Sequence, residues 1–187
     1  MKKLLVAVVV GVGLVGLTVP AVAGPVAGKK ILLKQGKKIV TLAKNQTGVE
    51  APTQAQLDSA TGAFLTVCSA NGQQADVMLP LGNFSLNKKG ILKYKVKGTA
   101  DVKKILIKGG KTLKIVGKSS IIPMGETLGG VGYKLVVGEV ENCAVFGAGS
   151  KDTGELFKAK DGTSPADCSD AAIGCVPLGS PSGAFLR

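Results

Sequence analysis

The segment of residues 88–118 constrains the fold most, because apolar residues alternate with lysines along much of it. Within residues 91–97, Leu92, Tyr94 and Val96 alternate with three lysines, Lys93, Lys95 and Lys97. A period of two places alternate side chains on opposite faces of a β-strand. The whole segment holds eleven lysines and one acid, Asp101. We therefore predict strands with one buried face and one basic face.

Residues 102–108 and 111–117 are predicted to form a hairpin around Gly109 and Gly110. A two-residue loop would mix apolar and charged side chains on both faces, whereas a three-residue loop that sets Lys108 opposite Thr112 separates them. We therefore predict a three-residue loop with a glycine in the left-handed conformation. The apolar face then carries Ile105, Ile107, Leu113 and Ile115, and the other face carries Lys104, Lys108, Lys114 and Lys118.

Residues 1–23 are predicted to be a cleaved export signal. Lys2 and Lys3 precede an apolar run over residues 4–19, and Ala21-Val22-Ala23 forms a small-residue cleavage site before Gly24. A retained membrane anchor is the alternative, but the apolar run is short for a membrane span and Pro20 suits cleavage.

Four cysteines in an exported chain predict two disulfides, and three pairings are possible. A metal site is disfavoured because the chain has no histidine and no Cys-x-x-Cys pair. The cysteines are Cys68, Cys143, Cys168 and Cys175.

Residues 29–37 open a second hairpin that matches the central one when the numbering is shifted by 74. The shift places Ile31, Leu33, Ile39 and Thr41 on the inward positions of the central hairpin. An internal duplication and two merely similar amphipathic hairpins both remain open as explanations.

The remaining chain is predicted to form short strands separated by glycine turns. Residues 24–28 are a lead-in, residues 45–61 a loop with one helical turn, and residues 155–158 a final edge strand. Strands are also expected at residues 62–70 and 75–81 around an Asn71-Gly72 turn, and at residues 84–86, 133–140 and 143–146. This predicts an all-β fold, an antiparallel β-sandwich or barrel-like domain over residues 24–160, with a turn-rich C-terminal tail, residues 161–187, held by cysteines.

Four short patterns resemble a class of uncharacterised secreted lysine-rich all-β bacterial proteins. They are Tyr94-Lys95-Val96-Lys97-Gly98, the run that ends at Lys118, Cys143-Ala144-Val145-Phe146-Gly147, and Phe157-Lys158-Ala159-Lys160 followed by Pro165-Ala166-Asp167-Cys168. The resemblance implies an extracytoplasmic β domain in which Cys143 is joined to Cys168, and it implies no activity. Cys68 and Cys175 would then be paired with each other by elimination. The rival pairing joins Cys168 to Cys175 and Cys68 to Cys143.

The usual residues of catalysis are scarce. The lack of histidine excludes a classical serine or cysteine triad. A glycine-rich dinucleotide fingerprint at residues 11–16 lies inside the export segment, and Ser85-x-x-Lys88 lacks its companion motifs. The alternative that remains is an extracytoplasmic hydrolase with a carboxylate pair drawn from Glu139, Glu141, Asp152, Glu155 and Asp161. Few aromatic residues are present to hold a sugar, and no metal or cofactor is predicted.

The lysines are the one functional candidate with a physical mechanism. A basic sheet face would concentrate anionic partners, although lysines on strands also serve solubility and protect edges. Arginine, the usual residue for bidentate recognition of bases, occurs once, at Arg187, so sequence-specific nucleic-acid binding is not expected. We predict a secreted or cell-surface, non-enzymatic structural protein that contacts anionic polymers or cell-surface glycans. The predicted anion-binding residues are Lys93, Lys95, Lys97, Lys104, Lys108, Lys114 and Lys118.

Overall fold

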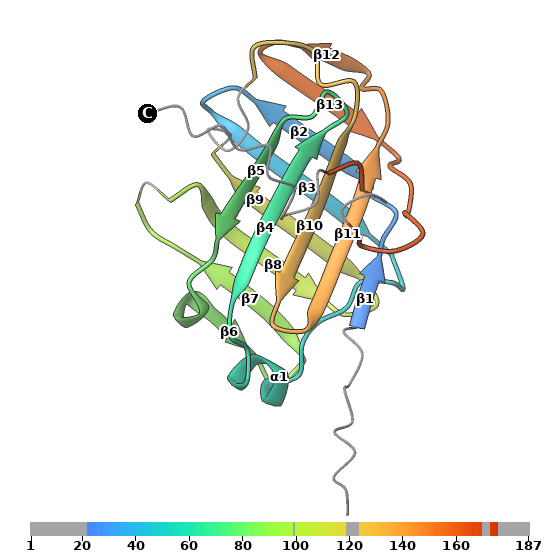
Figure 1. The fold of residues 1–187 in the computed structure, drawn as a ribbon. Helices are drawn as coiled ribbons and strands as arrows, with labels where there is room; N and C mark the ends of the chain where they lie inside the picture. Colours follow the sequence, from blue (N-terminus) through green and yellow to red (C-terminus); the bar gives the residue numbers. More distant parts are fainter. Residues whose placement is uncertain (1–21, 99, 119–123, 170–172, 176–187) are drawn as a thin grey trace, which may run out of the picture.

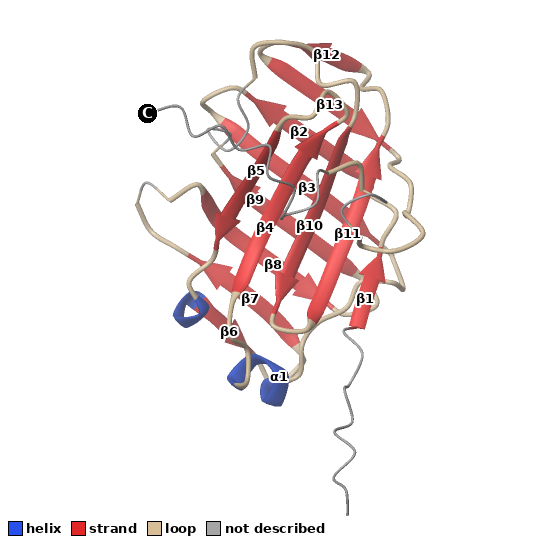
Figure 2. Cartoon of the chain, viewed as in Figure 1, coloured by secondary structure: helices blue, strands red, loops and turns tan. Residues whose placement is uncertain are grey.

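The protein is a sandwich of two packed β-sheets (Figure 1). The computed structural model describes residues 22–98, 100–118, 124–169 and 173–175. The predicted export signal lies outside the described residues, apart from its last two positions. Within the described residues, helix is confined to α1 (Gln54–Asp58) and the short 3₁₀ turn η1 (Leu81–Asn83) (Figure 2). The all-β prediction is confirmed, and the form is a sandwich.

The smaller sheet has five strands in the order β1-β11-β10-β4-β5. Their bounds are β1 (Val22–Pro25), β4 (Ala63–Ser69), β5 (Gln74–Met78), β10 (Val131–Val137) and β11 (Val140–Phe146). Neighbours are antiparallel except β1, which pairs with β11 in parallel. The expected lead-in at residues 24–28 is therefore partly a strand, which begins inside the predicted export signal.

The larger sheet has eight strands in the order β12-β13-β2-β3-β9-β8-β7-β6, all antiparallel. It lies behind the five-stranded sheet in Figure 1, and its strands cross those of the front sheet. The bounds are β2 (Lys30–Lys34), β3 (Lys38–Lys44), β6 (Phe84–Leu86), β7 (Ile91–Lys95), β8 (Val102–Lys108), β9 (Thr112–Gly117), β12 (Lys151–Thr153) and β13 (Leu156–Lys160).

Two strand predictions near the C-terminus are wrong in detail. The strand predicted at residues 155–158 is not at the edge, because β12 pairs on the outer side of β13. The strand predicted at residues 133–140 ends at Val137, since the chain turns at Gly138 with a φ of 61° and returns as β11. Glycine adopts that left-handed conformation at little cost, so the turn replaces the expected continuous strand.

The predicted register of the β8–β9 hairpin is confirmed. Lys108 lies opposite Thr112, Ile105 lies opposite Ile115, and Gly110 has a φ of 63°. The β2–β3 hairpin has the same register after a shift of 74 residues, with Gly36 at a φ of 60°. The two hairpins are joined through the β3–β9 pair, so they form the centre of one sheet.

The core lies between the sheets and includes the inward side chains that the alternation predicted for the two hairpins, together with residues of the five-stranded sheet. The largest fully buried side chains include Ile31, Leu33, Ile39, Leu65, Leu92, Ile105, Ile107, Leu113, Tyr133, Phe146 and Phe157. One buried polar residue, Asn142, fastens a loop to this core: its amide accepts from the Glu50 N–H and donates to the Glu50 carbonyl, both at 2.9 Å.

Two disulfides attach Cys168 and Cys175 to the outer side of the five-stranded sheet. Cys143 is joined to Cys168 and Cys68 to Cys175, with Cα atoms 5.5 Å and 5.3 Å apart. The Cys143–Cys168 bond is the one that the resemblance implied, the Cys68–Cys175 bond is the one left by elimination, and the rival pairing is not found. The four cysteines and Ile173 form a second, small buried cluster.

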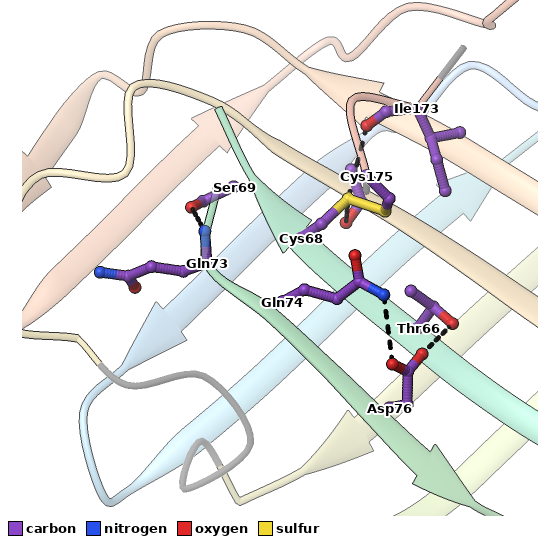
Figure 3. Close-up of a disulfide and its surroundings, with 9 residues drawn as sticks. Thr66, Cys68, Ser69, Gln73, Gln74, Asp76, Ile173 and Cys175 are labelled. Atoms are coloured by element: carbon purple, nitrogen blue, oxygen red, sulfur yellow. Dashed lines mark hydrogen bonds between the residues drawn. A yellow bond between two sulfur atoms is a disulfide. The ribbon is translucent and has the colours of Figure 1, made fainter. Parts of the chain in front are cut away.

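The Cys68–Cys175 bond sits beside a polar network on β4 and β5 (Figure 3). Asp76 accepts hydrogen bonds from the Thr66 hydroxyl and the Gln74 amide, and the Gln73 N–H donates to the Ser69 hydroxyl at 3.1 Å. These hydrogen bonds join β4, β5 and the turn between them, next to the disulfide.

Candidate functional site: a lysine face

The outward face of the eight-stranded sheet carries twelve lysines, and we refer to this set as the lysine face. Residues that are directly opposite in the strand register share a face, and the opposite face contains the buried core residues. The lysine face is therefore assigned from register and burial together. Its members are Lys30, Lys34, Lys38, Lys44, Lys93, Lys95, Lys104, Lys108, Lys114, Lys151, Lys158 and Lys160.

Five of the seven predicted anion-binding lysines lie together on this face. Lys93 and Lys95 are exposed on β7, next to the exposed lysines of β8 and β9, which are Lys104, Lys108 and Lys114. The other two lie beyond strand ends. Lys97 is exposed after β7, and Lys118 is half-buried after β9, where its N–H donates to the Asp101 carbonyl at 2.7 Å.

The other seven lysines of the face were not predicted as part of the site. They come from β2, β3, β12 and β13, which join the same sheet because β3 pairs with β9 and β13 pairs with β2. The 74-residue match was the signal that could have found some of them, since it places Lys30 and Lys34 at the positions of Lys104 and Lys108. The missing information was that the two hairpins lie side by side.

Charges on the lysine face are of one sign in the strand positions. Among the described residues of the eight strands there is one acid, Asp152, and it lies opposite the inward Phe157. Its carboxylate accepts from the N–H groups of Leu128 and Gly129 at 2.9 Å and 2.8 Å. This acid therefore stabilises a loop and does not neutralise the face.

Several lysines of the face are direct cross-strand neighbours. Lys95 lies opposite Lys104, Lys30 lies opposite Lys160, and Lys151 lies opposite Lys158. Like charges in such positions destabilise a sheet slightly. Salt or a bound polyanion would screen or neutralise these charges and so reduce the repulsion between them.

Apolar side chains lie between the lysines at half-buried outward positions, among them Leu32, Val40, Leu42, Leu106 and Val116. The methylene stems of lysine lie readily along such apolar surface while the ammonium group stays in water. The contact surface offered to a partner therefore consists mainly of exposed ammonium groups above half-buried apolar side chains.

The candidate carboxylates of the hydrolase alternative are distributed over separate places. Glu155 and Asp161 line two different hollows, each as the one acid among its described lining residues. Glu139 lies in the β10–β11 turn, and Glu141 lies two residues further on, half-buried on β11. The Asp152 carboxylate binds the loop described above. Within the described part of the chain, no three His, Cys, Asp or Glu side chains form a group that could hold a metal ion.

The described residues include no helix that is long and apolar enough to cross a membrane. Comparison with protein-family models, curated proteins and solved structures found no match to this chain.

Proposed function

We propose that the protein is an exported, non-enzymatic structural or cell-surface protein that binds anionic polymers through its lysine face. The observation that carries this proposal is the outward side of the eight-stranded sheet, where twelve strand positions are lysine and none is acidic. The resemblance to secreted lysine-rich β proteins and the two disulfides, which are typical of oxidising compartments, support the exported location.

The expected binding is electrostatic and loose. The Debye length is about 8 Å at physiological ionic strength, so charges act locally and a dense patch matters more than the net charge of the chain. Lysines on adjacent strands are within that distance, because strands lie roughly 4.8 Å apart. Lysine supplies flexible point charges without a fixed hydrogen-bonding geometry, which favours binding that does not depend on monomer sequence.

The test compares two variants with the same loss of charge. The face variant changes Lys93, Lys104, Lys108 and Lys114 to Gln, all exposed and contiguous on three strands. The control variant changes four exposed turn lysines to Gln, namely Lys37, Lys88, Lys89 and Lys111. Binding to heparin and to duplex DNA is measured by titration over a range of salt concentrations.

The wild-type protein is expected to bind both polymers with an affinity that falls steeply with salt. The face variant should lose about one unit of the log–log salt slope for each lysine that contacts a phosphate of the DNA. The control variant should keep nearly the wild-type slope. Equal effects of the two variants, or no binding at low salt, would contradict a role for the lysine face.

A further inference from the structure

A hollow of ≈ 430 Å³ lies at one end of the strands β13, β2 and β3, at the border of the lysine face. It is lined by residues from three separate parts of the chain, which are Ala27, Gly28, Lys29, Lys44, Asn45, Gln46, Asp161 and Gly162. The volume lies within the range of small-molecule sites in proteins, roughly 300–1,000 Å³.

Two left-handed residues shape this hollow. Asn45 and Asp161, with φ of 59° and 50°, are the two non-glycine residues with positive φ among those described, and both line it. Asn45 follows the last residue of β3 and directs the chain toward the β8–β9 turn, where the Gln46 N–H donates to the Lys111 carbonyl at 3.3 Å. Asp161 follows the last residue of β13. Such residues are uncommon and concentrate at ligand sites and turns.

The base of the hollow is fixed by close packing. The Gly162 N–H donates to the Gly28 carbonyl at 2.7 Å, and a side chain at either glycine would collide with the buried ring of Phe146. Glycine is therefore required at both positions by the approach of the backbone to the ring. The backbone at the base of the hollow is therefore fixed, whereas the polar side chains at its rim, such as Lys29 and Asp161, are exposed.

The lining groups combine positive charge with both donors and acceptors. Lys29 and Lys44 supply two ammonium groups, and Asn45 and Gln46 supply amides. Asp161 supplies a carboxylate, which lies 3.2 Å from the Lys29 ammonium in an exposed ion pair. A carboxylate beside the ammonium groups adds an acceptor for hydroxyl donors, and a sugar acid carries such hydroxyl groups next to its charge whereas a fully ionised phosphate or sulfate does not.

We infer that this hollow binds one acidic sugar unit, of the uronic acid type, within the anionic polymer that the lysine face attracts. This inference rests on the proposed function and adds a chemical class to it. The sugar carboxylate would pair with Lys44 or Lys29, while sugar hydroxyl groups would donate to the Asp161 carboxylate and bond with the two amides. The lysine face would supply the nonspecific attraction, and the hollow would select sugar polymers over polyphosphates.

The inference can be tested by removing one negative charge and measuring whether the affinity for each polymer rises or falls. In the full chain, Asp161→Asn removes a negative charge, so pure electrostatics predicts tighter binding of every polyanion. A sugar site predicts weaker binding of polygalacturonate, by about three- to tenfold, because a charged acceptor of hydroxyl groups is lost. Asparagine tolerates the left-handed conformation, so the fold is expected to survive the change. The Asp161→Asn variant and the wild type are titrated with polygalacturonate and with polyphosphate at equal charge concentration.

The matched control is Glu155→Gln, an equal charge change at an exposed turn residue that lines a different hollow. It should leave the preference between the two polymers unchanged. A second variant, Asn45→Gly, keeps the left-handed backbone and removes the amide, and it should also weaken polygalacturonate selectively. If Asp161→Asn tightens both polymers as Glu155→Gln does, the sugar site is refuted while the lysine face stands. If the wild-type chain binds neither polymer at low salt, the proposed function itself is refuted.

Discussion

Thr41 and Ile115 lie directly opposite each other in the β3–β9 pair, and their positions differ by 74 residues. This is the same interval that superimposes the two hairpin sequences, so the equivalent positions of the two hairpins meet at this pair. The surrounding β2-β3-β9-β8 arrangement is therefore approximately two-fold symmetric about it. The symmetry is broken in the core, where one position is polar and the other apolar.

The polar member of this pair gives a prediction about stability. The hydroxyl groups of Thr41 and Tyr133 are buried, have no hydrogen-bond partner in the described structure, and lie near each other across the core. A buried unpaired hydroxyl costs roughly 1–3 kcal/mol. We expect the free energy of unfolding of the double variant Thr41→Val, Tyr133→Phe to exceed that of the wild type by about 1–2 kcal/mol. Urea denaturation measures this difference. The single variants complete a cycle, and a double variant less stable than wild type would show that the two hydroxyls are in fact satisfied.

Tyr133 also predicts how stability changes at alkaline pH. Burial raises the pKa of its phenol well above the ordinary value, because the charged form loses its hydration. The unfolded chain therefore releases this proton at lower pH than the folded chain, so stability is complete below about pH 10 and falls as the pH rises above it. The fall attributable to this residue is about 1.4 kcal/mol per pH unit. Tyr133→Phe should flatten the pH profile by that amount, and an unchanged profile would contradict the assignment.

The Lys95–Lys104 pair predicts a salt-dependent gain from one substitution. Because the two side chains are directly opposite, Lys95→Glu replaces a repulsion by an attraction and should raise the free energy of unfolding by about 0.5–1 kcal/mol at low salt. The gain should shrink at high salt, since both residues are exposed. Lys93→Glu is the matched control, because Lys93 lies opposite Leu106. Thermal unfolding at two salt concentrations measures both, and a gain that is equal for both variants would argue against the pairwise cause.

The two disulfides are expected to differ in their contribution to stability. Cys68 and Cys175 are 107 residues apart, whereas Cys143 and Cys168 are 25 apart. In the chain-entropy description these loops correspond to about 4.8 and 3.5 kcal/mol respectively. Replacing Cys68 and Cys175 by Ala should therefore lower the denaturation midpoint more than replacing Cys143 and Cys168. The reverse order would show that local packing of the tail outweighs loop length.

Local patterns predicted individual strands and hairpins well, because the alternation of side chains and the glycine turns are properties of short segments. The β8–β9 register followed from the requirement that Ile105 and Ile115 share the buried face. The pairing of β3 with β9 did not follow, since it joins segments far apart in the chain, and seven of the twelve lysines of the face were missed with it. The strand β1 was missed for a similar reason: Val22–Pro25 has little strand character of its own and is held by β11. The hollow beside Asp161 needs three distant segments, so no single stretch of sequence could indicate it.

The nesting of the two disulfides has a consequence for how the protein matures. Each of the first two cysteines to be synthesised is joined to one of the last two, so neither native bond can form until residue 168 has been made. Cys68 and Cys143, which become available earlier, belong to the same buried cluster on one side of the five-stranded sheet. In the assembled sheet β10 separates the strands that carry these two cysteines, so they are too far apart to be joined. An oxidant that acts before the sheet forms can join them, and reshuffling such a bond takes seconds to hours. Maturation should therefore require a disulfide isomerase, besides an oxidant, whenever oxidation precedes assembly of the five-stranded sheet.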